Sequence, residues 1–143
     1  MRRHIIVVVL TLSLAACATP PMGADGTLPR HALIATSWLA QAIDGTAVDP
    51  AVQSTVTFQR EDQVIGSGGC NRYFGRLGLS GSTLSISSVG NTRMTCSPAP
   101  VMEQEQRFLE ALQASVAWRR EGDTLVLLDL AGRERLRLAR AAA

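Results

Sequence analysis

The sequence predicts a mainly β (α+β) domain, in which about eight short antiparallel strands form a strongly bent sheet or open barrel and one helix is inserted before the last three strands. Three observations predict this class. Apolar and polar residues alternate with a period of two along most of the chain after residue 36. Glycine-containing turn signals separate the alternating stretches, and only the stretch after Pro98 has helical spacing.

The strands expected before the helix follow from this alternation. In the stretch 51–59, Val52, Val56 and Phe58 share one face with Ser54, so these four side chains are expected to point into the core. The dipeptide Asp44-Gly45 is typical of a hairpin turn. The expected strands cover residues 37–43, 51–59, 62–67, 71–77 and 83–87.

The stretch 71–77 has two different faces. One face carries Tyr73, Gly75 and Leu77, and the other carries Arg72, Phe74 and Arg76. Side chains two residues apart on a strand point to the same side, so the two sets are expected to lie on opposite faces of the sheet.

The helix is expected to begin within a proline-rich segment. Ser97 is a typical N-cap residue, Pro98 suits the first helical position, and Pro100 falls in the first turn, where no backbone donor is lost. Glu103 and Glu105 are expected near the positive N-terminal end of the helix dipole.

An apolar stripe predicts which face of this helix packs against the sheet. Its members are Val101, Phe108, Leu109 and Leu112. Polar residues on the other faces are expected to contact water, and these are Gln104, Arg107 and Gln113.

Three strands are expected after the helix, at residues 115–120, 124–130 and 134–138, the last two as a hairpin. The stretch LVLLDL, residues 125–130, is apolar on both faces, which predicts a strand in the middle of the sheet. In the last strand, arginines alternate with Leu136 and Leu138, a pattern typical of a half-exposed or edge strand.

The N-terminus has the features of a bacterial export signal. Arg2 and Arg3 precede an apolar stretch, residues 5–14, that is shorter than the about 20 apolar residues of a membrane-spanning helix. The sequence Leu14-Ala15-Ala16-Cys17 resembles the lipobox of bacterial lipoproteins. In that group the chain is cut before the cysteine, which carries lipid.

This resemblance implies a domain organisation and a location. Residues 1–16 are expected to be a lipoprotein signal peptide, residues 17–32 a flexible tether and residues 33–139 one folded domain. Acyl chains such as palmitate on Cys17 would anchor the protein, and Ala18 in place of an aspartate implies the periplasmic face of the outer membrane. The alternative is a secreted protein with an unmodified cysteine.

The charge balance argues against nucleic acid as a partner. All 14 basic residues are arginine, against 12 acidic residues. Because Arg2 and Arg3 leave with the signal peptide, the expected mature chain has 12 of each and a net charge of zero. No net basic field remains to attract nucleic acid.

Cys70 and Cys96 form an even pair once Cys17 is assigned to lipid. In an oxidising compartment the expected state is a disulfide, which would stabilise the fold by about 3–4 kcal/mol in the chain-entropy model. The alternative is two buried free thiols.

Catalytic and metal-binding chemistry is sparse in this chain. The expected mature chain has one histidine, His31, and it lies in the tether. A serine or cysteine nucleophile needs a base within hydrogen-bond reach, and two thiols without histidine partners make a poor metal site. We therefore expect no enzyme activity, no metal and no cofactor. A hydrolase site built by distant Asp and Glu residues is the remaining enzymatic alternative.

Two sequence signatures resemble those of the META domain family, whose members include the HslJ-like heat-inducible bacterial lipoproteins. GSGGCNRYFG matches the first signature and NTRMTC matches the second. The matching positions are Gly66, Gly69, Cys70, Asn71, Gly75, Thr92, Met94 and Cys96. Trp38-Leu39 matches the opening of the family pattern, and the resemblance covers residues 33–138.

The resemblance implies a non-catalytic envelope lipoprotein of the META/HslJ type, a stress-linked binding or assembly-support module at the outer membrane. Its partner would be a protein or an apolar ligand of the envelope. The alternative is an interaction or inhibitor module that acts on a periplasmic enzyme or the cell wall.

The motif residues are expected to be mainly structural. The glycines let another backbone approach closely, and Asn71 bonds neighbouring backbone groups or adopts a left-handed conformation. The functional alternative is a polar recognition patch formed by Asn71, Arg72 and Arg93.

Overall fold

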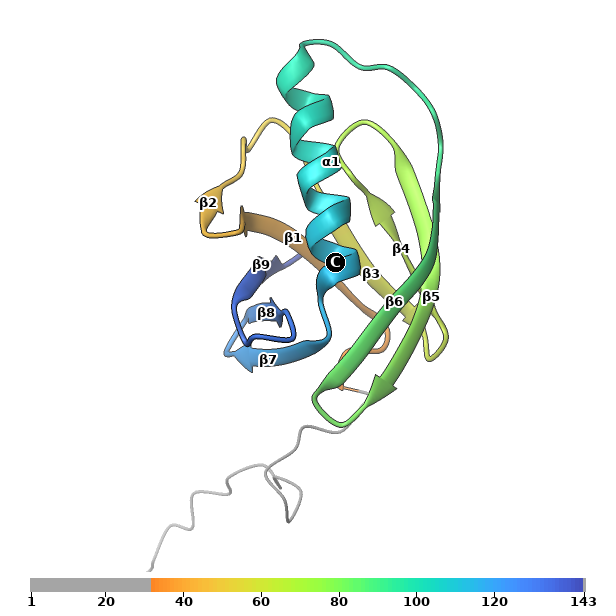
Figure 1. Ribbon diagram of the computed structural model, residues 1–143, viewed down its shortest axis with the longest axis vertical. Coiled ribbons are helices and arrows are strands. Elements are labelled where there is room, and N and C mark those ends of the chain that lie inside the picture. The colour runs from red at the N-terminus through yellow and green to blue at the C-terminus, as the bar shows by residue number, and fades with distance from the viewer. Residues whose placement is uncertain (1–31, 143) are drawn as a thin grey trace, which may run out of the picture.

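The computed structural model describes residues 32–142, and in this range the chain forms nine strands and one helix (Figure 1). The signal peptide expected at residues 1–16, the lipid site at Cys17 and the tether up to residue 31 lie outside the described residues. The elements are β1 (Thr36–Ile43), β2 (Thr46–Ala47), β3 (Thr55–Arg60), β4 (Gln63–Ser67), β5 (Arg72–Ser80), β6 (Thr83–Asn91), α1 (Ala99–Ala114), β7 (Ala117–Glu121), β8 (Thr124–Leu128) and β9 (Glu134–Arg140).

All strands belong to one antiparallel sheet with the order β2-β1-β3-β4-β5-β6-β7-β8-β9. The sheet is strongly curved, and its last strand, β9, also pairs with β1. The predicted mainly β class, with one helix before the last three strands, is therefore confirmed. The additional strand, β2, is the second half of a hairpin whose turn is Asp44-Gly45.

The prediction of an edge position for the last strand is wrong, and the half-exposed alternative is correct. β9 pairs with β8 on one side and with β1 on the other, for example Leu138 with both Leu125 and Ala40. Alternating arginine and leucine reports only that one face contacts the core, and this is true of β9 whether or not its second edge is paired.

The sheet is held least tightly between β6 and β7. These strands share one register pair, Thr83 with Ala117, whereas the neighbouring β5–β6 and β7–β8 ladders are long. The helix α1 follows β6, and Figure 1 shows it lying between the β1–β2 side and the β5–β6 side of the curved sheet. The helix contacts β9, β6 and β1, and its side chains Phe108, Ala111 and Leu112 belong to the core.

The core consists of the apolar faces that the alternation predicted. Val52, Ser54, Val56 and Phe58 are all buried, as expected, although β3 itself begins only at Thr55. The largest fully buried side chains include Trp38, Trp118, Phe58 and Phe108. Each such side chain contributes roughly 1.5–3 kcal/mol by leaving water.

The strand β8 is buried on both faces, as its sequence predicted. Leu125 and Leu127 belong to the core, and Val126 lies on the other face in register with Arg119 and Arg137. Val126 is nevertheless fully buried. Long arginine side chains cover apolar surface with their methylene groups, which explains this burial.

The helix starts later than the sequence predicted. Its first residue is Ala99, and Pro98 is the N-cap because its carbonyl oxygen accepts the hydrogen bond of the Val101 N–H. Ser97 therefore lies outside the helix and does not cap it, and Pro98 is not the first helical residue. Pro100 lies in the first turn, as expected.

The helix buries two polar residues, Gln104 and Glu105. The prediction that Gln104 contacts water is wrong, and the burial of Glu105, expected only near the N-terminal end of the helix, was not predicted. The reason is the helical period, since positions 104 and 105 fall on the same stripe as Phe108 and Leu112.

Candidate binding site

The two sequence signatures meet beneath the helix N-terminal half, where Glu105 receives three hydrogen bonds. Its Oε2 accepts the backbone N–H groups of Cys70 at 2.9 Å and Asn71 at 2.5 Å. Its Oε1 accepts the Asn71 side-chain Nδ2 at 2.7 Å. Only 3% of Glu105 is exposed, so the carboxylate is satisfied almost entirely by this loop.

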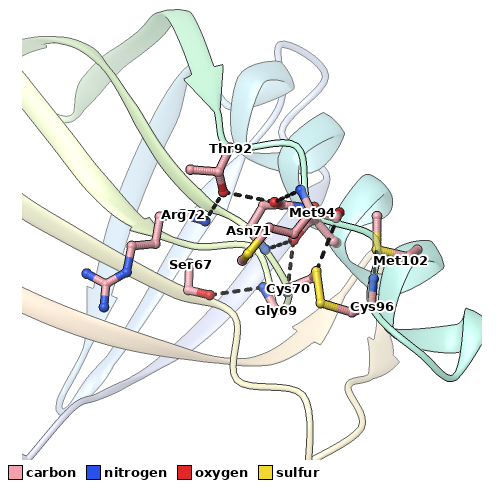
Figure 2. The surroundings of a disulfide bond; sticks show 10 residues. Ser67, Gly69, Cys70, Asn71, Arg72, Thr92, Met94, Cys96 and Met102 are labelled. Atoms are coloured by element: carbon pink, nitrogen blue, oxygen red, sulfur yellow. Dashed lines mark hydrogen bonds between the residues drawn. A yellow bond between two sulfur atoms is a disulfide. The ribbon is translucent and has the colours of Figure 1, made fainter.

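Asn71 joins the same loop to the segment after β6 (Figure 2). Its Oδ1 accepts the Thr92 hydroxyl at 2.8 Å and the Met94 N–H at 2.7 Å, and its Nδ2 also donates to the Met94 carbonyl at 3.1 Å. Together with the bond to Glu105, these contacts occupy every donor and acceptor of the amide. Asn71 therefore forms hydrogen bonds to neighbouring backbone groups, which was one of the two structural roles expected for it.

A disulfide joins Cys70 and Cys96, with 5.8 Å between the two Cα atoms. The bond lies beside the Asn71 contacts and links the same two segments (Figure 2). The Cys96 N–H donates to the sulfur of Met102 at 3.5 Å, which connects this linkage to the first turns of α1. The alternative of two free thiols does not hold in this structure.

A second buried network ties the helix to the start of β3. The Gln104 Oε1 accepts the Asp49 N–H at 2.8 Å, and its Nε2 donates to the Val52 carbonyl at 2.9 Å. The Ser54 hydroxyl donates to the Gly68 carbonyl at 2.6 Å. Gln104 thus fixes the helix to the segment before β3, and Glu105 fixes it to the loop that carries the first signature.

Two glycines of the first signature are required by close contacts. A Cβ atom at Gly66 would lie 2.0 Å from the Thr55 carbonyl oxygen and 2.8 Å from the Tyr73 ring. A Cβ atom at Gly68 would lie 2.6 Å from the Cγ atom of Glu105. Tyr73 itself donates to the Thr55 carbonyl at 2.8 Å, and burial raises the pKa of its hydroxyl far above the ordinary value.

A groove of about 900 Å³ opens beside the disulfide on the face of β3, β4 and β5. Its lining side chains are mostly hydroxyl-bearing or apolar, and Arg72 is the one charged residue among them. Its other residues include Thr55, Thr57, Ser67, Thr92, Ile65 and Met94, and 55% of Met94 is exposed. Gly66, Gly69 and Cys70 also line it.

The three residues of the predicted recognition patch lie in different environments. Asn71 is only 2% exposed and has no free polar atom. Arg72 is exposed and borders the groove, and Arg93 is exposed next to the groove residue Thr92. Asn71 therefore positions the neighbouring backbone, and only the arginines have side chains available to a ligand.

The remaining motif residues support this arrangement. Gly75 is buried in β5, where a Cβ atom would lie 3.2 Å from the Ser87 carbonyl oxygen. Thr92 accepts the Arg72 N–H at 3.2 Å through its hydroxyl, so it joins β5 to the second signature.

Glu105 and Gln104 are the site residues that sequence reasoning missed. Gln104 was expected to contact water and Glu105 was placed only near the helix dipole, whereas the helical spacing of both residues from Phe108 indicated the buried face. The spacing was the signal that could have found them.

Among residues 32–142, no three His, Cys, Asp or Glu side chains are grouped closely enough to hold a metal ion. The described part of the chain also has no helix with the length and apolar character needed to cross a bilayer.

The fold and the buried network define a class of small α+β domains, in which one helix completes a curved antiparallel sheet and a disulfide joins the two signature segments. The chain belongs to the META domain family, whose sequence model matches residues 31–143. A comparison with curated proteins gives no match.

Solved structures share the fold. An NMR structure of a protein from Burkholderia xenovorans is 25% identical over 95% of this chain and 100% of that chain, with a TM-score of 0.64. Another NMR structure is 21% identical over 78% of this chain and 94% of the other, with a TM-score of 0.62. A crystal structure of a DUF4847 family protein from Bacteroides vulgatus is 16% identical over 75% of this chain and 93% of that chain, with a TM-score of 0.51.

Proposed function

We propose that this protein is a non-catalytic envelope lipoprotein that uses the groove beside the disulfide to bind a partner. The observation that carries the proposal is the composition of the groove, in which hydroxyl and apolar side chains surround a single charged residue, Arg72. Such a lining offers contacts for recognition, whereas acid–base catalysis needs a titratable donor or acceptor beside the reacting group.

The rigidity of the groove wall supports the same function. Cys70 and Thr92 line the groove and are held by the Glu105–Asn71 network, Cys70 also by the disulfide, and the Gly69 N–H donates to the Ser67 hydroxyl at 3.2 Å. A binding surface built on fixed backbone loses little conformational entropy when the ligand arrives. The buried network therefore prepares the surface, and the exposed side chains are left to make the contacts.

Membrane anchoring through Cys17 is the second part of the proposal, and it rests on the lipobox-like sequence Leu14-Ala15-Ala16-Cys17. Diacylglyceryl and palmitoyl chains on one cysteine give stable anchoring. Globomycin is expected to cause accumulation of the uncut precursor, and Cys17→Ser is expected to release the protein from outer-membrane fractions. Processing that is unaffected by both changes would contradict the anchoring.

Binding at the groove is tested by photo-crosslinking in cells at normal and elevated temperature. The crosslinking amino acid p-benzoylphenylalanine is placed at Gln53, which is exposed and lines the groove, or at Leu130, which is 92% exposed but lies outside it. A discrete adduct from position 53 alone supports the proposal, and its increase with heat supports the stress link. Identical weak labelling from both positions would refute groove binding.

The same experiment distinguishes this function from the alternative, an interaction or inhibitor module that acts on a periplasmic enzyme or the cell wall. An adduct with a periplasmic enzyme or with peptidoglycan fragments would favour it, and an adduct with an outer-membrane assembly component would favour the first function.

A further inference from the structure

The outer face of β5 carries an exposed aromatic residue between two arginines. Arg72, Phe74 and Arg76 alternate with the buried residues of this strand, and Phe74 is 60% exposed. Across the sheet, Phe74 pairs with Ile65 on β4 and with Gly90 on β6. A Cβ atom at Gly90 would lie 2.7 Å from the Phe74 ring, so the ring lies directly over this glycine.

A hollow lies on each side of the row formed by Ile65 and Phe74. The first is the groove of about 900 Å³, whose charged residue is Arg72. The second has a volume of about 430 Å³ and contains Arg60 and Arg76 together with Asp62. The face therefore presents a positive side chain on both sides of an apolar centre.

The arginines of this face differ from those on the opposite part of the sheet. On β7 to β9 and their turns, arginines form ion pairs with carboxylates, as in Arg119–Glu121 at 2.8 Å and Arg137–Glu134 at 2.8 Å. Within residues 32–142, by contrast, Arg72 and Arg76 have no carboxylate within 4.0 Å, and Arg60 bonds only the Gln63 amide. Among residues 32–142, six arginines form no ion pair, and three of them, Arg60, Arg72 and Arg76, lie around Phe74.

We propose that this face, hereafter the Phe74 face, binds an extended acidic segment of a partner protein. Arg72 and Arg76 are four residues apart on one strand, a distance of about 13 Å at the usual rise of a β-strand. Alternate side chains of an extended segment point the same way, so carboxylates four residues apart would meet the two arginines. The apolar side chain halfway between them would pack on Phe74. Arginine binds carboxylates with two parallel hydrogen bonds, which gives this pairing its specificity.

The structure favours such a segment over an acyl chain. Hydroxyl groups line the larger hollow, and both hollows are open to solvent, whereas acyl chains are bound in enclosed apolar cavities. The proposal rests on the binding function proposed above and adds the chemistry of the partner.

The test is selection of a random twelve-residue peptide library on the mature chain, beginning at Cys17 and purified in detergent. Selected peptides are expected to carry the pattern acid-x-apolar-x-acid. The double variant R72Q/R76Q is expected to bind the selected peptides at least about tenfold more weakly than the parent. The variant F74S is also expected to bind these peptides more weakly. The control R107Q/R140Q removes the same charge from exposed arginines elsewhere and is expected to bind normally. Because all five positions are exposed, each variant is expected to remain folded, and thermal unfolding measures any loss from the contacts of Phe74 with Gly90 and of Arg140 with the Trp38 ring, 5.6 Å away.

Three results would overturn the proposal: selected peptides without acidic residues, binding that R72Q/R76Q leaves unchanged, or binding only to vesicles of phosphatidylglycerol and phosphatidylcholine. Raising the salt concentration from 50 to 500 mM should also weaken the binding of the selected peptides, because salt screens the interaction between exposed charges. If position 53 crosslinks a partner in cells and acidic peptides fail, the binding function stands and this inference falls. If neither occurs, both fall.

Discussion

Replacing Glu105 tests the buried network most directly. The side chain accepts three hydrogen bonds, two from backbone N–H groups and one from Asn71 Nδ2. Glu105→Gln keeps the shape of the side chain but turns one oxygen into an NH₂ group. If the remaining oxygen stays with the two backbone groups, the new NH₂ faces the Asn71 NH₂ at the present 2.7 Å, donor against donor.

The magnitude follows from the donors that lose their acceptor. A buried donor without a partner costs about 1–3 kcal/mol, so E105Q is expected to lower the free energy of unfolding by about 2–3 kcal/mol. Glu105→Ala leaves all three donors unpaired and adds a cavity, so about 3–5 kcal/mol is expected. At about 4–8 °C per kcal/mol for a domain of this size, E105Q should lower Tm by roughly 10 °C or more.

The assay is urea and thermal denaturation of the oxidised mature protein, followed by circular dichroism. Glu103→Gln is the matched control, because Glu103 is exposed on the same helix and is expected to change stability by less than about 0.5 kcal/mol. If E105Q proves as stable as E103Q, the carboxylate does not hold the signature loop and the reasoning is refuted.

Three further predictions concern the same region. Gly66→Ala should prevent folding or lower the free energy of unfolding by more than about 3 kcal/mol, because the new methyl group would lie 2.0 Å from a carbonyl oxygen. The control Gly45→Ala places its methyl group in open space at φ +76° and should lower the free energy of unfolding by about 1 kcal/mol. Urea denaturation measures both values. Replacing Cys70 and Cys96 together by serine should lower stability by about 3–4 kcal/mol, and calorimetry that finds equal stability would contradict a structural disulfide. The single tyrosine, Tyr73, should show no ionisation at 295 nm up to pH 11 while the protein is folded; its contribution to stability is complete below the unfolded pKa of about 10 and declines as the pH rises above that value. Ionisation at pH 10 in the folded state would show that the hydroxyl is solvated.

The local features of the fold could be predicted from the sequence because they depend on residue spacing. Alternation placed Val56 and Phe58 inside, and it separated Tyr73 from Phe74 correctly. The Asp44-Gly45 turn was also evident, since glycine and aspartate tolerate the positive φ values of 76° and 49° found there.

Features that depend on distant partners could not be predicted. Whether β9 has a free edge is decided by β1, about a hundred residues earlier, and the arginine–leucine pattern of β9 is the same in both cases. The position of Glu105 was missed for a related reason. A buried carboxylate is unfavourable unless donors surround it, and those donors come from the backbone of Cys70 and Asn71, which any residue type would supply.

The short pairing between β6 and β7 has a consequence for how this domain unfolds. Only Thr83 and Ala117 are in register there, and α1, which connects β6 to β7 along the chain, packs on β6, β9 and β1. Glu105 holds the N-terminal half of this helix to the signature loop, and the disulfide holds the segment before it. Loss of these contacts should let β6 and β7 part before the long ladders break, while the β1–β9 pairing keeps the sheet joined on its other side. Hydrogen exchange in the reduced protein should then be fastest at the Leu84 and Trp118 amides, which bridge the gap. Uniform exchange across all strands would mean that the domain opens as one unit.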